Sequence, residues 1–241
     1  MRIAPVLVLL ACGSSSSPPP PVANAAVAPK PVVKSTHGLE LKVVDSDAPY
    51  MQMLFLHVGM ERDGAATDPA AISAGVTMEL DAWRIDADPK RHSDFYLQGQ
   101  DRATLERYVE QLVLKEPRFI LPSDRELRFE QVEARRWRSY YLEKAVRLDG
   151  SMVKDATSEA DPNTGIPTVW LDLDEEGTRR LADVTKQIVG RKLAIVVDGV
   201  VRSAPIINGE IAGGRVSIRM GGSDPAQQAR DAAQLVDALK Q

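Results

Sequence analysis

Hydrophobic and polar positions follow a clear order in the second half of the chain. The order predicts a strand, a helix, a second strand and a tight hairpin turn, over Thr168–Leu173, Asp174–Val189, Leu193–Val197 and Asp198-Gly199. The carboxylate of Asp174 can accept hydrogen bonds from free amides of the first helical turn, and Gly190 can end the helix in a left-handed conformation. Nothing in this unit is chemically reactive, so it reads as a scaffold.

Elsewhere the periodicity is shorter and less regular. It predicts further strands at Leu39–Asp45, Tyr50–Val58, Asp94–Gln98, Tyr140–Val146, Val201–Ile207 and Val216–Met220, and helices over Asp101–Leu114 and from Asp224 onward. For Tyr50–Val58 a short helix is the alternative. Closely alternating acidic and basic residues in 123–138 indicate a solvated face or connector, and 59–89 is too broken by glycine and proline to assign. The expected fold class is α+β, an antiparallel or mixed sheet with helices packed on one face.

The first residues have the order of a secretion signal. A charged residue and an apolar run precede Leu9-Leu10-Ala11-Cys12, which resembles the bacterial lipobox. We expect a lipoprotein signal peptide over 1–12 with Cys12 as the lipidated residue, a disordered Ser/Pro/Ala-rich tether over 13–37, and folded parts over 38–145 and 146–241. An ordinary signal peptide or a mistaken start codon stays possible. Gly13 lacks the aspartate of an inner-membrane retention signal, which slightly favours the outer membrane.

Composition excludes few classes of function. The net charge of −4 gives no electrostatic argument for nucleic acid, and acidic neighbours offset the basic and aromatic run 135–141. Cys12 is the only cysteine, so an internal disulfide framework is excluded. His37, His57 and His92 show no metal-ligand spacing. We therefore expect neither a metal nor a cofactor.

Three strings in the second half carry a family resemblance. They are Leu193–Gly199, Ser203–Ile207 and Ile211–Gly214, and they resemble the large periplasmic domain of SecD, an accessory membrane subunit of the bacterial protein-export machinery. The similarity is close from about Val146 to Leu239 and thinner before it. The family's proton-coupling residues lie in membrane helices that we do not find here. The resemblance thus implies a periplasmic, SecD head-like module rather than proton-driven export.

The leading functional hypothesis is a non-catalytic, lipid-anchored envelope module that faces the periplasm and binds secreted chains or translocon components. Its expected contact residues lie at a hairpin edge, although core packing is an equal alternative; they are Val200, Val201, Ile206 and Ile207. A second hypothesis is an envelope hydrolase that uses the clustered carboxylates Asp172, Asp174, Glu175 and Glu176, whose simpler explanation is helix capping. A third is a structural envelope assembly protein. The lipid anchor would be the sole membrane contact.

Overall fold

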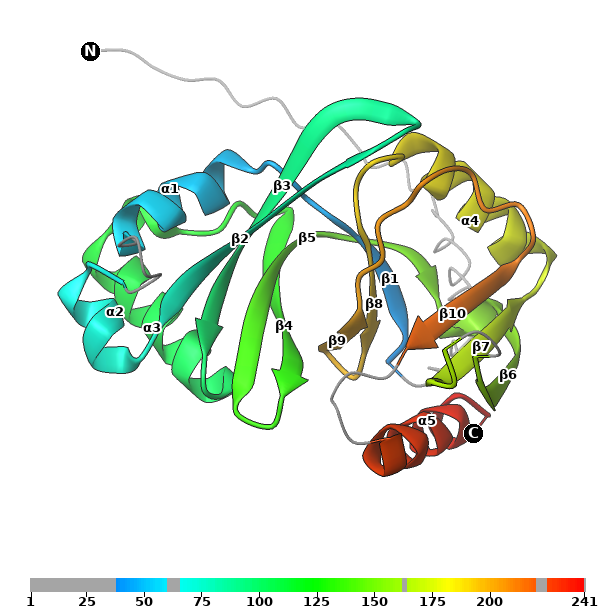
Figure 1. The fold of residues 1–241 in the computed structure, drawn as a ribbon. Coiled ribbons are helices and arrows are strands. Elements are labelled where there is room, and N and C mark those ends of the chain that lie inside the picture. The colour runs from blue at the N-terminus through cyan, green and yellow to red at the C-terminus, as the bar shows by residue number, and fades with distance from the viewer. Residues whose placement is uncertain (1–37, 60–65, 162–163, 220–224, 241) are drawn as a thin grey trace, which may run out of the picture. The chain divides into compact units, whose positions relative to one another are not determined.

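A computed structural model describes residues 38–59, 66–161, 164–219 and 225–240, which belong to one compact unit (Figure 1). The helices are α1 (Pro49–Val58), α2 (Pro69–Ala74), α3 (Arg102–Lys115), α4 (Glu175–Gln187) and α5 (Pro225–Lys240), with 3₁₀ turns η1 (Pro117–Phe119) and η2 (Gly150–Met152). The strands are β1 (Glu40–Val44), β2 (Thr77–Ile85), β3 (Asp88–Gly99), β4 (Arg125–Glu133), β5 (Arg136–Asp149), β6 (Val153–Ala160), β7 (Pro167–Leu173), β8 (Leu193–Val197), β9 (Val200–Ser203) and β10 (Arg215–Arg219).

Two sheets organise these strands. The larger has the order β1-β8-β9-β4-β5-β3-β2, and a further pairing of β1 with β5 closes five of its strands into a ring. The pair β4–β9 is parallel, through Phe129 and Val200, whereas the other pairs are antiparallel. The smaller sheet has the order β10-β7-β6. The predicted α+β class with a mixed sheet is confirmed.

The helices divide between two hydrophobic cores. Helices α4 and α5 share a core with β7 and β8, in which Val169, Leu171, Leu181 and Ile195 are at most 1% exposed. Helices α1, α2 and α3 pack on a second core together with residues of β3, β4 and β5. Each helix therefore buries one apolar face, which is the main stabilising term of such a layer.

The central unit forms as its pattern predicts. Asp174 caps α4 by accepting a hydrogen bond from the Gly177 amide at 2.7 Å. The turn between β8 and β9 has positive φ at both Asp198 (51°) and Gly199 (75°), the conformation that a type I′ hairpin requires. Helix α4 ends at Gln187, two residues before the predicted end at Val189, with Ile188 as its C-cap. Gly190 has the predicted positive φ, 87°.

Two predicted elements are wrong. Residues 50–58 form helix α1 rather than a strand: Pro49 stands in its first turn, and Met51, Leu54 and Val58 are buried at helical spacing. Residues 123–138 contain β4 and the start of β5, so the connector is wrong, whereas the solvated face fits the half-buried and exposed residues of β4. The alternating charges pair across the two strands, as between Glu130 and Arg138 at 2.6 Å.

Some predictions concern residues outside the described ranges or stretches that the sequence left unassigned. The unassigned stretch 59–89 contains α2 and β2. The predicted cap Asp224 and the strand end Met220 lie outside the described residues, as does Cys12. Strand β5 runs across 145/146, so the predicted division of the folded part at that point stays a prediction. No helix in the described ranges is both long and apolar enough to span a membrane.

Candidate protein-binding groove

Of the four residues expected at a hairpin edge, Val200 and Val201 lie on β9, an interior strand of the large sheet, whereas Ile206 and Ile207 follow β9 outside the named strands. Val201 is 1% exposed and Ile207 is 3% exposed, whereas Val200 and Ile206 are half-buried. Strand β9 lies between β8 and β4, so the expected edge position is wrong for Val200 and Val201. The error follows from assigning β4 to a connector, since β4 is the strand that covers β9.

Two of these residues nevertheless line an open groove. The groove has a volume of about 370 Å³ and lies between β8, the segment 205–211, α4 and β10. Its apolar lining consists of Leu181, Leu193, Ile195, Pro205, Ile206, Ile207, Ile211 and Val216. Its polar lining consists of Asn208, Glu210, Arg215 and Ser217. An apolar lining with a few polar groups is typical of binding sites for apolar ligands.

Strand β10 contributes a sheet edge to this groove. It pairs with β7 on one side, with Val216 opposite Leu171, and it is the outermost strand of the three-stranded sheet among the described residues. Successive side chains of a strand point to opposite faces. Because three consecutive residues of β10 line the groove, the groove meets this strand from its edge. Unpaired amide and carbonyl groups on such an edge can accept an added strand.

A buried threonine of α4 holds one wall of the groove. Thr185 is fully buried, and its hydroxyl donates a hydrogen bond to the Leu181 carbonyl at 2.7 Å. The same oxygen accepts a hydrogen bond from the Ile211 amide at 2.9 Å. This contact fixes the segment 205–211 against α4. The sequence offered no signal for it, because a threonine within a helix normally satisfies its hydroxyl on the preceding turn.

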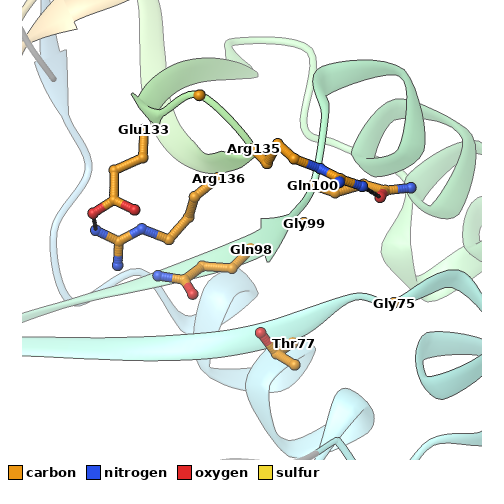
Figure 2. Close-up of a pocket in the computed structure, with 9 residues that line it drawn as sticks. Gly75, Thr77, Gln98, Gly99, Gln100, Glu133, Arg135 and Arg136 are labelled. Carbon is orange, nitrogen blue, oxygen red and sulfur yellow. Dashed lines mark hydrogen bonds and ion pairs between the residues drawn. The ribbon is translucent and has the colours of Figure 1, made fainter.

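A second hollow has a different chemistry. It measures about 590 Å³ at the ends of β2 and β3 and at the β4–β5 turn, and its lining is polar (Figure 2). Figure 2 shows Arg136 facing Glu133 and Arg135 beside Gln100. The Arg136–Glu133 ion pair measures 3.0 Å, and Arg135 donates a hydrogen bond to Gln100 at 3.3 Å. Since these polar groups satisfy one another and the walls lack large apolar side chains, this hollow does not suit an apolar segment.

The clustered carboxylates each have a structural partner or a place in a helical turn. Asp174 caps α4, and Asp172 lies 3.4 Å from Arg215. Hydrogen bonds from Arg179 and Arg180 lower the pKa of Glu176, which keeps it ionised rather than available as a general acid. Glu175 lies in the first turn of α4, where the helix dipole favours negative charge.

His57 and His92 each lie beside an acidic side chain. His57 is half-buried, and its Nδ1 lies 3.5 Å from Oε1 of Glu116. His92 is buried, and its Nε2 lies 2.9 Å from Oδ2 of Asp88. Within the described ranges, no three His, Cys, Asp or Glu side chains are arranged to hold a metal ion. His37 lies outside the described residues.

Comparisons with known proteins concern the second half of the chain. The family model for the SecDF P1 head subdomain matches residues 126–239, beginning before Val146, where we placed the start of close similarity. Protein translocase subunit SecD of Desulfurispirillum indicum is 45% identical over 92 residues, which cover 38% of this chain and 18% of that protein. The subunit of Sebaldella termitidis is 40% identical over 91 residues, covering 38% of this chain and 22% of that protein.

The chain thus spans about a fifth of the length of these relatives. A solved structure of the membrane component SecDF is 20% identical, with a TM-score of 0.37 and coverage of 84% of this chain and 92% of that chain. The groove, α4, β8 and β10 all lie within the residues that the family model matches. The chain contains a SecD periplasmic head-like domain.

Proposed function

We propose that this protein is a non-catalytic binding module of the bacterial envelope that takes up an extended, apolar segment of another protein in the groove beside β10. The single observation that supports this most is the edge of β10 along an apolar hollow, an edge that pairs with no strand of the described ranges. An added strand would gain main-chain hydrogen bonds from the edge, while alternate side chains enter the apolar lining.

The class of partner follows from the chemistry of the groove and from the relatives. A folded protein keeps its backbone groups paired and its apolar side chains buried, so it presents little that fits an open edge and an apolar wall. A chain in an unfolded, extended state presents both. Relatives of the head-like domain are named as protein translocase subunits. We therefore propose an exported chain as the occupant, with translocon components as further partners.

The anchor is proposed from sequence. Cys12, after its apolar run, would carry the lipid, and the tether 13–37 would give the periplasm-facing domain reach from the membrane, with the outer membrane slightly favoured. Incorporation of a clickable palmitate analogue into the full chain in its native host tests this, with Cys12→Ser as the control. Equal labelling of both proteins would refute lipidation of Cys12.

Site-specific crosslinking tests the groove. A photoreactive phenylalanine analogue placed at Ile206, inside the groove, should form adducts with a purified exported precursor held unfolded in dilute urea. The same analogue at Ile72, which is 60% exposed on α2 and remote in sequence from the groove, serves as the matched control. Equal adduct yields at the two positions would refute the groove as the binding site. Val200 and Val201 stay predicted contacts, and an analogue at half-buried Val200 tests them separately.

A further inference from the structure

The segment Gly190–Leu193 forms the backing of one groove wall. The Gly190 amide donates to the Ile207 carbonyl at 2.8 Å, and the Ile207 amide donates to the Arg191 carbonyl at 2.9 Å. The Leu193 amide donates to the Pro205 carbonyl at 3.1 Å, and the backbones of Lys192 and Ile206 form an isolated antiparallel β-bridge. The groove residues 205–207 therefore take their position from 190–193, since their backbone is paired to that segment.

The β2–β3 hairpin also contacts the segment 190–193, through its side chains. The indole Nε1–H of Trp83 on β2 donates a hydrogen bond to the Gly190 carbonyl at 2.8 Å. The Lys192 ammonium lies 2.8 Å from Asp81 and 3.0 Å from Asp94, and its Nζ lies 4.1 Å from the centre of the Trp83 ring. These contacts join parts of the chain that are about a hundred residues apart.

The approach of the hairpin to Gly190 leaves no room for a side chain. Gly190 has φ of 87°, and a Cβ atom there would lie 2.5 Å from Nε2 of His92 and 2.9 Å from Oδ2 of Asp88. Both of those atoms belong to β3. The contact between hairpin and segment is thus tight on the β3 side, at His92 and Asp88, as well as on the β2 side, at Trp83.

We propose that the β2–β3 hairpin positions the groove wall, with Trp83 and Lys192 as positioning residues that act through 190–193 on 205–207. The inference rests on the proposed function of the groove and adds a source of control outside the matched residues 126–239. A displacement of the hairpin would be transmitted to the groove through two successive hydrogen bonds, from Trp83 to Gly190 and from Gly190 to Ile207.

Trp83→Phe in the full chain tests the inference, because it removes the indole donor and keeps an aromatic ring. The probe is a fluorescein-labelled peptide in which ten valine and serine residues alternate, and affinity is measured by fluorescence anisotropy. Loss of one neutral hydrogen bond corresponds to about threefold to tenfold weaker binding if it holds the wall in place. Trp137→Phe, on β5 and packed on the other core, is the matched control and should leave the affinity unchanged.

Amide hydrogen exchange supplies a readout that does not depend on the peptide. In Trp83→Phe the amides of Gly190 and Ile207 should exchange about threefold to tenfold faster relative to the Val169 amide of β7, because one contact of their segment is lost. If the wild-type protein fails to bind the peptide, the proposed function fails, while exchange still tests the positioning. If Trp83→Phe matches the wild type in exchange, or binds the peptide as tightly as the wild type does, the positioning inference is overturned.

Discussion

Replacing Lys192 by methionine should destabilise the fold, and the surroundings of its ammonium group set the size of the effect. The Lys192 side chain is 6% exposed and bridges two aspartates that differ in their access to water. Asp81 is 47% exposed and can be hydrated after the ammonium is lost. Asp94 is 4% exposed, so water cannot replace the lost ammonium there. The Tyr96 hydroxyl still donates a hydrogen bond to Asp94 at 3.1 Å.

Removing one partner of a buried ion pair and leaving the other charged costs about 3–5 kcal/mol. We expect the lower end for Lys192→Met, about 3 kcal/mol, because Asp94 keeps one hydrogen bond. In a domain of this size that loss corresponds to a fall in Tm of roughly 10 °C. Urea unfolding followed by circular dichroism gives the free energy, and an unchanged slope would show that the compactness of the two states is unaltered.

Two further variants decide whether the stranded charge is the cause. Adding Asp94→Asn to Lys192→Met removes the charge and keeps an acceptor for Tyr96, so it should restore about 2 kcal/mol. Lys90→Met removes an equal charge from a pair with Asp47 in which the lysine is 63% exposed, and should cost less than about 1 kcal/mol. A double variant as unstable as Lys192→Met alone would refute the reasoning.

Three other variants or conditions have expected outcomes. Asp174→Ala removes the cap of α4 and should lower the free energy of unfolding by about 1 kcal/mol, whereas an unchanged urea midpoint would contradict the capping role. Gly199→Ala places a Cβ at a φ of 75° and should cost about 1 kcal/mol in the same assay, with Gly209→Ala, where a Cβ meets open space, as the control. Burial tends to raise the pKa of Glu126 and Glu143, but hydrogen bonds from Arg128 and Lys42, and from Arg147 and Arg191, outweigh it and lower the pKa of each below 4.5. The stabilisation from these two carboxylates is therefore present above pH 4.5 and is lost as the pH falls through the lowered pKa values. We expect the urea concentration at the unfolding midpoint to decrease when the pH is taken below 4.5, and to decrease by less in Glu126→Gln.

Local signals in the sequence predicted the elements that local chemistry determines. The cap at Asp174, the apolar strand Leu193–Val197 and the turn at Asp198-Gly199 all depend on residues within a few positions of one another. Helix α3 was found for the same reason, since Asp101 accepts from the Thr104 amide at 2.7 Å. Helix α1 was misread because a run of ten residues without a charge fits a buried strand and a helix equally well.

Properties that depend on distant pairing were out of reach. Whether β9 lies at a sheet edge depends on its pairing with β4, which lies about seventy residues earlier. The many charged residues of β4 do not predict a strand unless their partners on β5 are known. The groove was found only in part. Ile206 and Ile207 were predicted as contact residues at a hairpin edge, whereas the contact of Thr185 with Ile211 and the edge position of β10 are consequences of packing.

The ring of five strands explains why the residues before 126 belong to the proposed binding unit. Strand β1 lies between β8 and β5, and its Leu41 and Val43 enter the same core as Leu193 and Ile195, which line the groove. Without β1, the β8 strand would lose one of its two hydrogen-bonded neighbours, and its fully buried apolar residues would reach water. The β2–β3 hairpin adds the grip on 190–193 from outside the ring. The head-like residues 126–239 supply the groove, and the preceding residues close the ring and hold the segment that backs the groove.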